Sequence, residues 1–173
     1  MMKFIRMLPF ILFTILALLF GVALVNGQSA NRSALTNEKI PSFSLRSFSR
    51  PNALFQSSEM QKPSLLVFWA SWCGICKTEL PALSQFAQKN NIPLYGIAYR
   101  DNHQALLTTM YQMQHQVKFT DMGLDQTGEV GAKYGLTGVP TTIVIARDGS
   151  IARVKSGAMT ERELKNEILP VMR

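Results

Sequence analysis

The chain has 173 residues, which is typical of one domain and argues against an enzyme that combines two domains with a large cofactor fold. Its formal net charge is +7, but the Lys and Arg residues are scattered singly and do not cluster with aromatic residues, which disfavours nucleic-acid binding. The hydrophobic fraction of 47% is raised by one local run, the nineteen uncharged residues from Met7 to Val25.

This uncharged run predicts a membrane anchor. As a helix it would extend about 28 Å, close to the ~30 Å of a bilayer's hydrocarbon core and longer than the apolar part of a signal peptide. Lys3 and Arg6 precede it, so the positive-inside rule sends the rest of the chain across the membrane. A signal peptide cleaved after Gly27 is the alternative. The expected parts are a cytoplasmic N-terminus (1–6), one transmembrane helix (7–25), a tether rich in Asn, Ser and Gln (26–40), and a domain (41–173) on the periplasmic side of a bacterial inner membrane.

The first elements of the domain predict a βαβ unit. Ser64–Ala70 is a short continuous apolar run, as in a strand buried on both faces of a sheet. Gly74–Asn90 has helical spacing, with a kink expected at Pro81. Ile92–Tyr99 is a second apolar strand, and the order predicts a parallel pair with a right-handed crossover.

An inserted αβα segment follows. A helix is predicted from Asp101 to about His115, with Asp101 as its N-cap and Gln104 as the capping partner. The segment continues with a short strand over 119–124 and a helical turn over 129–134. It separates the βαβ unit from the last part of the domain.

The last part predicts a ββα unit. Strands over 141–146 and 151–155 flank the hairpin dipeptide Asp148-Gly149. Thr160-Glu161-Arg162-Glu163 is a capping box that opens a final helix, which Pro170 is expected to stop. The whole order predicts an α/β fold around a central mixed sheet.

The two cysteines of the chain, Cys73 and Cys76, form a C-x-x-C motif at the predicted strand-to-helix junction. Here the first thiol meets the unpaired N–H groups and the positive end of the helix dipole, which lower its pKa. Cys76 lies almost one turn further along the helix and is less exposed. The motif therefore predicts a redox pair in which Cys73 attacks and Cys76 resolves the mixed disulfide.

Two structural interpretations of the cysteines compete with the redox one. A structural disulfide would close a very short loop and remove little chain entropy, so it would stabilise the fold weakly. A zinc site would need further ligands, but His103 and His115 lack metal-ligand spacing and are expected on the surface. Phosphate-binding glycine patterns are absent from the sequence as well, so we expect no metal, nucleotide or flavin beside the redox-active Cys73–Cys76 disulfide.

Two segments resemble thioredoxin-fold proteins. Phe-Trp-Ala-Ser-Trp-Cys-Gly-Ile-Cys-Lys, over 68–77, is similar to their active-site stretch, and Gly-Val-Pro-Thr, over 138–141, resembles the loop that holds their cis-proline. The resemblance implies a thioredoxin fold in which Pro140 is cis. It also implies that Val139 and Pro140 face the cysteines and bind the backbone of the substrate.

Further segments narrow the resemblance to one subfamily. The segments over 96–101, 134–138 and 167–170, together with the anchor, resemble the membrane-anchored periplasmic thioredoxins of cytochrome c maturation, the DsbE or CcmG family. The resemblance covers about Pro41 to Arg173. Gly-Val-Pro-Thr-Thr is also similar to the broader TlpA-like group of membrane-anchored thiol reductases, so clients other than cytochromes remain an alternative.

Three side chains near the motif, Glu79, Lys77 and Trp72, are supporting candidates. Glu79, three positions after Cys76 on the same helix face, would take a proton from that thiol, unless it is an ordinary solvated glutamate. Lys77 would add positive potential near Cys73, unless it is only an exposed helix lysine. Trp69 is expected inside the sheet and Trp72 at the rim, where it would cover the disulfide and contact a partner protein.

The function expected from these residues is that of a thiol-disulfide oxidoreductase working as a reductant. Gly74 and Ile75 place neither a cation nor a histidine between the cysteines, so Cys73 is not strongly stabilised as a thiolate. The expected partners are disulfides of apocytochrome c or of a maturation partner, and a membrane-embedded thiol donor; a monomer is expected. The alternatives are an oxidant, a redox-inactive chaperone or binding module, and a peroxidase.

Overall fold

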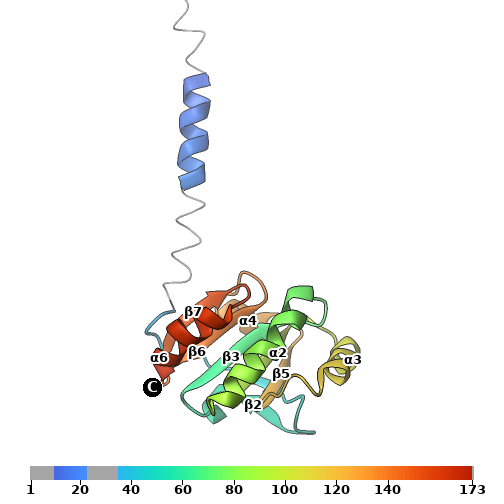
Figure 1. Cartoon of the computed structure of the whole chain (residues 1–173). Coiled ribbons are helices and arrows are strands. Elements are labelled where there is room, and N and C mark those ends of the chain that lie inside the picture. The colour runs from blue at the N-terminus through green and yellow to red at the C-terminus, as the bar shows by residue number, and fades with distance from the viewer. Residues whose placement is uncertain (1–9, 23–34, 173) are drawn as a thin grey trace, which may run out of the picture. The chain divides into compact units, whose positions relative to one another are not determined.

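The structure is a computed structural model that describes residues 10–22 and 35–172 (Figure 1). The chain divides into two compact units, Met1–Ala34 and Leu35–Arg173. In the first unit, residues 10–22 form a helix with exposed side chains. Within the two described ranges, no helix has both the length and the apolar character needed to cross a membrane. The other parts of the expected N-terminal arrangement, residues 1–6, 7–9, 23–25 and 26–34, lie outside the described residues.

The second unit is built on a five-stranded mixed sheet in the order β5-β4-β3-β6-β7. All six residues of the central strand β3 (Ser64–Trp69) are buried, as its apolar run predicts. β3 pairs in parallel with β4 (Leu94–Tyr99), which pairs in parallel with β5 (Asp121–Asp125). On the other side β3 pairs antiparallel with β6 (Thr141–Ile145), and β6 with β7 (Ile151–Ser156). The thioredoxin-like α/β fold is therefore confirmed.

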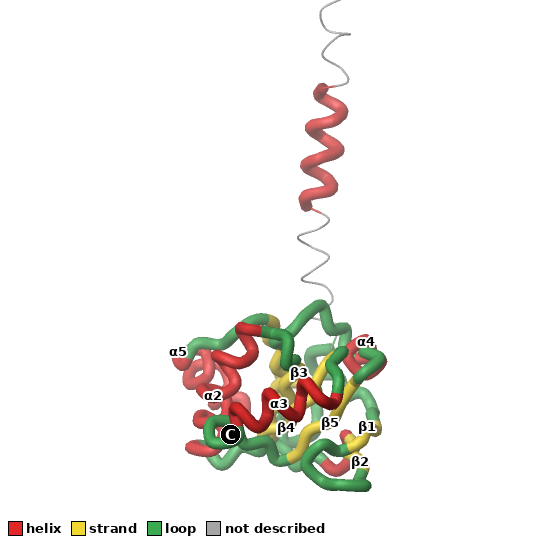
Figure 2. Tube along the Cα trace, turned by 90° about the vertical axis from the view of Figure 1, so that its right-hand side faces the viewer, coloured by secondary structure: helices red, strands yellow, loops and turns green. Residues whose placement is uncertain are grey.

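Helices cover both faces of the sheet (Figures 1 and 2). One core contains side chains of α2 (Gly74–Lys89), α3 (His103–Met113) and the C-terminal helical segment, packed on Leu65, Val67 and Trp69 of β3. The other contains α4 (Glu129–Lys133) and the N-terminal part of the unit, packed on the alternate β3 residues Leu66 and Phe68. The period of two along β3 thus gives each face its own core.

The structure corrects the start of α3. Asn102, not Asp101, is the N-cap, and its side chain accepts the N–H of Ala105 at 2.8 Å. Both residue types favour a cap, so a shift of one position is not resolved by the sequence. Asp101 instead accepts hydrogen bonds from Ser71, in the loop that leads into Cys73.

The C-terminal helix is also longer than expected. The capping box at Thr160 and Glu163 is confirmed and opens α5 (Glu161–Glu163). A π-helix, η2 (Leu164–Ile168), follows, and α6 (Leu169–Met172) contains Pro170, so the proline does not stop the helix. Pro170 is the second residue of α6, directly after the π-helix.

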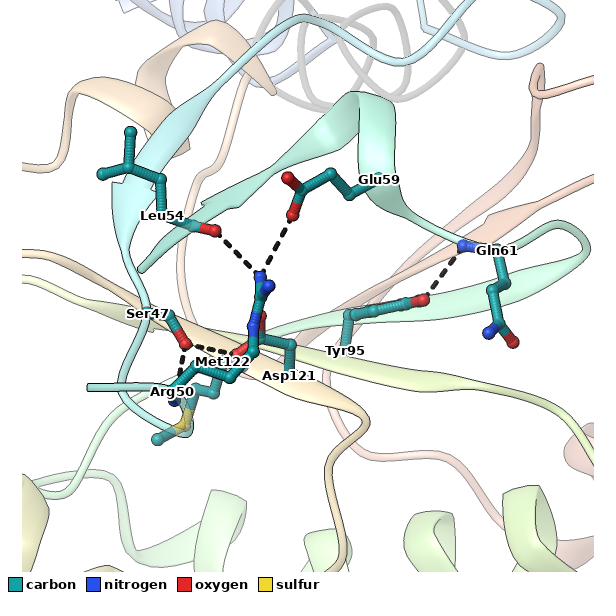
Figure 3. A network of polar contacts seen from close by, with 8 residues as sticks. All are labelled: Ser47, Arg50, Leu54, Glu59, Gln61, Tyr95, Asp121 and Met122. Carbon is teal, nitrogen blue, oxygen red and sulfur yellow. Dashed lines mark hydrogen bonds and ion pairs between the residues drawn. The ribbon is translucent and has the colours of Figure 1, made fainter. Parts of the chain in front are cut away.

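An N-terminal hairpin was not predicted. It consists of β1 (Ser44–Arg46) and β2 (Leu54–Gln56), followed by a 3₁₀ turn, η1 (Ser57–Glu59). The hairpin is fastened to β5, where Asp121 binds Ser47 and Arg50 (Figure 3). The domain also begins before Pro41, because Asn37 and Glu38 exchange backbone hydrogen bonds of 2.8 Å with Ile151. Residues 35–40, assigned to the tether from the sequence, are therefore part of the domain.

Candidate active site

The two cysteines lie where β3 passes into α2 and form a disulfide with a Cα–Cα distance of 5.3 Å. Cys73 is the N-cap of α2, and its Sγ accepts the N–H of Cys76 at 3.2 Å. Cys73 retains 8% of its surface exposed, whereas Cys76 is fully buried. The predicted inequality of the two sulfurs in exposure is thus confirmed, and only Cys73 is open to a partner.

The loop before β6 faces this disulfide. Because β6 runs antiparallel to β3, the start of one strand lies beside the end of the other, and Thr141 pairs with Phe68. The peptide bond between Val139 and Pro140 is cis, as predicted. The Val139 carbonyl oxygen lies 3.8 Å from Cys73 Sγ. Val139 therefore lies beside the Cys73 sulfur, and the cis-proline follows it.

The two tryptophans are placed as predicted. Trp69 is fully buried and stacks on Phe119, while Trp72 is 61% exposed beside Cys73. The Trp72 indole N–H donates to the carbonyl oxygen of Arg100 at 3.2 Å. Ile75 is also 61% exposed, so apolar surface surrounds the reactive sulfur.

Glu79 is buried, and the solvated alternative is therefore wrong. Its Oε1 accepts the backbone N–H of Met159 at 3.0 Å. Burial raises the pKa of Glu79, opposed by the Met159 hydrogen bond and by the charge of Lys155. A carboxyl of raised pKa on the helix that carries Cys76 fits a group that exchanges a proton.

A lysine that sequence reasoning missed, Lys155, acts on Glu79. Lys77 is exposed on the first turn of α2. Lys155, near the end of β7, forms an ion pair with Glu163 and lowers the pKa of Glu79. Local spacing around the C-x-x-C motif contains no signal for Lys155, because it lies on β7, more than 70 positions after Glu79.

Sequence reasoning also missed the role of Asp101. Its carboxylate accepts the N–H of Ser71 at 2.6 Å and the hydroxyl of Ser71 at 2.7 Å. The signal for this contact lies in the predicted topology: carboxyl ends of parallel β3 and β4 meet at one edge, and Ser71 and Asp101 follow those ends.

The histidines lie on the surface, as expected. His103 is exposed and has its ring 5.4 Å from that of Phe48, and His115 is exposed after the end of α3. Across residues 10–22 and 35–172, no three His, Cys, Asp or Glu side chains are grouped so that they could hold a metal ion.

A C-x-x-C disulfide at a helix N-terminus, on a thioredoxin-like sheet and opposite a cis-proline, defines a protein thiol-disulfide oxidoreductase. The chain belongs to the redoxin family, whose sequence model matches residues 35–168, and within it to the thiol:disulfide interchange proteins of the DsbE type.

Three relatives illustrate this membership. The chain is 32% identical to the "Probable thiol:disulfide interchange protein DsbE-2" of Pasteurella multocida, over 92% of this chain and 83% of that protein. It is 26% identical to the thiol:disulfide interchange protein DsbE of Xylella fastidiosa, over 95% of this chain and 86% of that one. A thio-disulfide isomerase structure from Thermus thermophilus is similar, with a TM-score of 0.65, 28% identity, and coverage of 79% of this chain and 96% of that chain. These relatives support thiol-disulfide exchange as the chemistry of the C-x-x-C pair.

Proposed function

We propose that the protein is a membrane-anchored periplasmic reductant of protein disulfides in cytochrome c maturation. The observation that carries its chemistry is that Cys73, beside Val139, keeps 8% of its surface exposed, whereas Cys76 is fully buried. Exposure and the helix N-terminus make Cys73 the attacking sulfur, and burial makes Cys76 the resolving one.

The reaction has two steps. The Cys73 thiolate attacks one sulfur of the client disulfide, which forms a mixed disulfide and releases the other client sulfur as a thiolate. Cys76 then loses its proton to Glu79 and attacks Cys73 Sγ; the mixed disulfide breaks and the second client thiolate leaves. Two electrons pass from the protein dithiol to the client, and the protein ends with the Cys73–Cys76 disulfide. Val139 and Pro140 hold the client backbone, Trp72 contacts the client, and Lys77 adds positive potential near the Cys73 thiolate.

Reduction is favoured over oxidation because no cation or imidazole separates the cysteines, and because the Glu79 carboxylate opposes a strongly stabilised thiolate. The reduction potential should lie near the about −270 mV of thioredoxin rather than the about −120 mV of a periplasmic oxidant. A glutathione equilibrium titration measures it. A value above about −170 mV would replace the reductant with an oxidant on the same fold.

The client and the compartment rest on the resemblance to the cytochrome c maturation thioredoxins and on the uncharged run at 7–25. In this proposal the run anchors a monomer, apocytochrome c or a maturation partner supplies the disulfide, and a membrane-embedded thiol donor restores the dithiol. The Cys73–Cys76 pair acts without metal, nucleotide or flavin. General thiol reduction of other clients, as in the TlpA-like group, is the second candidate, favoured by the sequence Gly-Val-Pro-Thr-Thr.

Trapping with Cys76→Ala tests the client. Without the resolving sulfur the mixed disulfide persists, so the captured protein can be identified. We expect apocytochrome c or a cytochrome maturation protein in the membrane fraction, and no adduct in Cys73→Ala/Cys76→Ala. Capture of unrelated clients would favour the general reductase. Recovery of the protein as a soluble form starting near Gln28 would end the anchor proposal.

A further inference from the structure

Asp101 fastens the segment that leads into Cys73. This aspartate follows β4, is only 5% exposed, and receives three hydrogen bonds. The N–H of Ser71 reaches Oδ2 at 2.6 Å, while the Ser71 hydroxyl and the Asn102 N–H reach Oδ1 at 2.7 and 2.9 Å. Both oxygens are thus engaged, and two of the three donors belong to the residue two positions before the attacking cysteine.

A second contact from the same loop fixes the neighbouring tryptophan. The carbonyl of Arg100 accepts the indole N–H of Trp72 at 3.2 Å. Arg100 adopts a left-handed backbone conformation, with φ of 47°, and its own N–H donates to the carbonyl of Asp125 on β5 at 2.8 Å. The loop is therefore tied to the sheet on one side and to Ser71 and Trp72 on the other.

These contacts fix the position of the segment that leads into Cys73. Disulfide exchange requires the attacking sulfur to line up with the client's disulfide bond while the Val139 loop holds the client. Ser71 and Trp72 have left β3 and have not yet entered α2, so neither element's ladder of hydrogen bonds fixes them. We propose that Asp101 is a positioning residue, which holds the Ser71–Cys73 segment so that the Cys73 sulfur meets a docked disulfide. This inference rests on the proposed attack by Cys73.

The chain contains a matched control at the far edge of the sheet. Asp121 is also 5% exposed, accepts a serine hydroxyl (Ser47, 2.7 Å) and accepts the N–H of the next residue (Met122, 2.8 Å) (Figure 3). Its Oδ2 binds Arg50 instead of a backbone N–H. Asp121 fastens the β1–β2 hairpin and not the cysteine loop, so the same substitution there changes stability alone.

The decisive variant is Asp101→Asn. A carboxamide has one acceptor oxygen, and in either orientation its amino group faces a backbone N–H, from Ser71 or from Asn102. The segment is loosened without a change of side-chain volume. Asp121→Asn loses one acceptor in the same way.

The experiment uses the full chain in detergent with Cys76→Ala as the parent. Two reactions of Cys73 are timed: mixed-disulfide formation with the oxidised peptide Cys-Ala-Ala-Cys-His, and alkylation by iodoacetamide across a pH profile. Loss of a charge-assisted hydrogen bond predicts about tenfold slower reaction of Asp101→Asn with the peptide. Iodoacetamide needs no docking, so its limiting rate at high pH should stay within about twofold of the parent, as should both rates of Asp121→Asn.

A second variant, Ser71→Ala, tests the same contact in case Asp101→Asn does not fold. Ser71→Ala removes the hydroxyl donor and keeps the backbone N–H bond, so it should slow the peptide reaction less. Combining the two substitutions should slow it no more than Asp101→Asn alone, because both act through one contact.

Three outcomes would overturn this inference and leave the proposed function standing. In the first, Asp101→Asn reacts with the peptide as fast as the parent. In the second, Asp101→Asn and Asp121→Asn slow the peptide reaction equally, and in the third the effects of Ser71→Ala and Asp101→Asn on that rate are additive. A different outcome separates it from the proposed function. If Cys73→Ala forms the mixed disulfide and Cys76→Ala does not, the attacking cysteine is misassigned, and both proposals fail.

Discussion

Glu79 shows how position alone changes the chemistry of one residue. On an isolated helix it would be a solvated carboxylate, but the packing of α2 against the C-terminal segment buries it at 7% exposure. Burial disfavours the charged form of Glu79 and raises its pKa. The Met159 N–H donates a hydrogen bond to the carboxylate and favours the charged form. The raised pKa and the retained hydrogen bond fit a residue that takes up and releases a proton where it lies.

Glu79→Gln should separate the two steps of exchange. The amide still accepts from Met159 but cannot take a proton from Cys76, so release of the client should slow, on the order of 10²-fold for a lost general base. Formation of the mixed disulfide should change far less, because Glu79 takes no proton in that step. Rapid quenching with a peptide disulfide measures both steps. Equal slowing of both would assign Glu79 to structure only.

The same variant has a stability signature. A raised carboxyl pKa contributes stability that is complete below the ordinary value of 4.5 and is lost as the pH rises through the raised value. Glu79→Gln removes this loss, so its thermal midpoint should exceed that of the wild type at about pH 8 and approach it at about pH 4. A lower midpoint at both pH values would contradict the assignment of burial as the main cause.

Residues with a local signal were predictable, and those that depend on distant partners were not. The positions of Trp69 and Trp72 and the Thr160 capping box follow from neighbouring sequence, because strand periodicity and a four-residue motif each act locally. The cis-Pro140 bond follows only from the resemblance of Gly-Val-Pro-Thr to a known loop. The role of Asp101 has no local signal, because its partner, Ser71, lies thirty positions away. β1 and β2 have three residues each, too few to show alternation.

At the scale of elements, two ion pairs join β7 to the C-terminal helical segment. Lys155 pairs with Glu163, and Arg153 pairs with Glu167 at 2.6 Å. The hydrogen bond from Lys155, with those from Thr160, lowers the pKa of Glu163 to about 2. The pairs hold the helix that follows Met159 and its cap Thr160, and the Met159 N–H donates to Glu79.

Glu163→Gln should loosen this segment in a pH-dependent way. A lowered carboxyl pKa contributes stability that is present above the ordinary value of 4.5 and is lost as the pH falls toward about 2. The variant should therefore melt below the wild type at pH 7, and the gap should close over that acidic window. Glu161→Gln is the control, since the Glu161–Lys165 pair is exposed at 80% and 62% and should contribute little. A pH-independent gap would exclude the ion pair as the cause.

The β1–β2 hairpin depends on close approach at Gly123. A Cβ atom there would lie 2.8 Å from the Cβ of Leu45, closer than real contacts allow. Gly123→Ala should push the hairpin off β5 and lower the free energy of unfolding by about 1–3 kcal/mol, without changing the iodoacetamide reactivity of Cys73. Denaturant unfolding measures the loss. Leu45→Gly in the same chain should restore part of it; no recovery would locate the strain elsewhere.

At the scale of the whole molecule, the domain is a unit that starts at Leu35. Its first residues bond to Ile151, and two cores on opposite faces of one sheet hold the rest together. The expected start at Pro41 would omit the pairing of Asn37 and Glu38 with the start of β7. That pairing joins segments more than 100 positions apart, a separation at which sequence pattern carries no signal.

Truncation tests this boundary. A chain that begins at Leu35 should unfold in one cooperative transition, with the same thiol reactivity as the full chain. A chain that begins at Pro41 should be less stable by about 1–3 kcal/mol, because two backbone hydrogen bonds at β7 are lost. Equal stability of the two truncated chains would show that residues 35–40 add nothing.

Both edges of the five-stranded sheet are partly covered by residues from the N-terminal part of the domain. Ser47 bridges to Gly123 on β5, and Lys39 bridges to Ser150 just before β7. A protein that exchanges disulfides with unfolded chains is exposed to strand addition, in which an extended client extends the sheet and nucleates aggregation. The covered positions are closed to such growth. We therefore expect an unfolded client to leave after exchange as a free chain, and not to accumulate as an extra strand on the protein that reduced it.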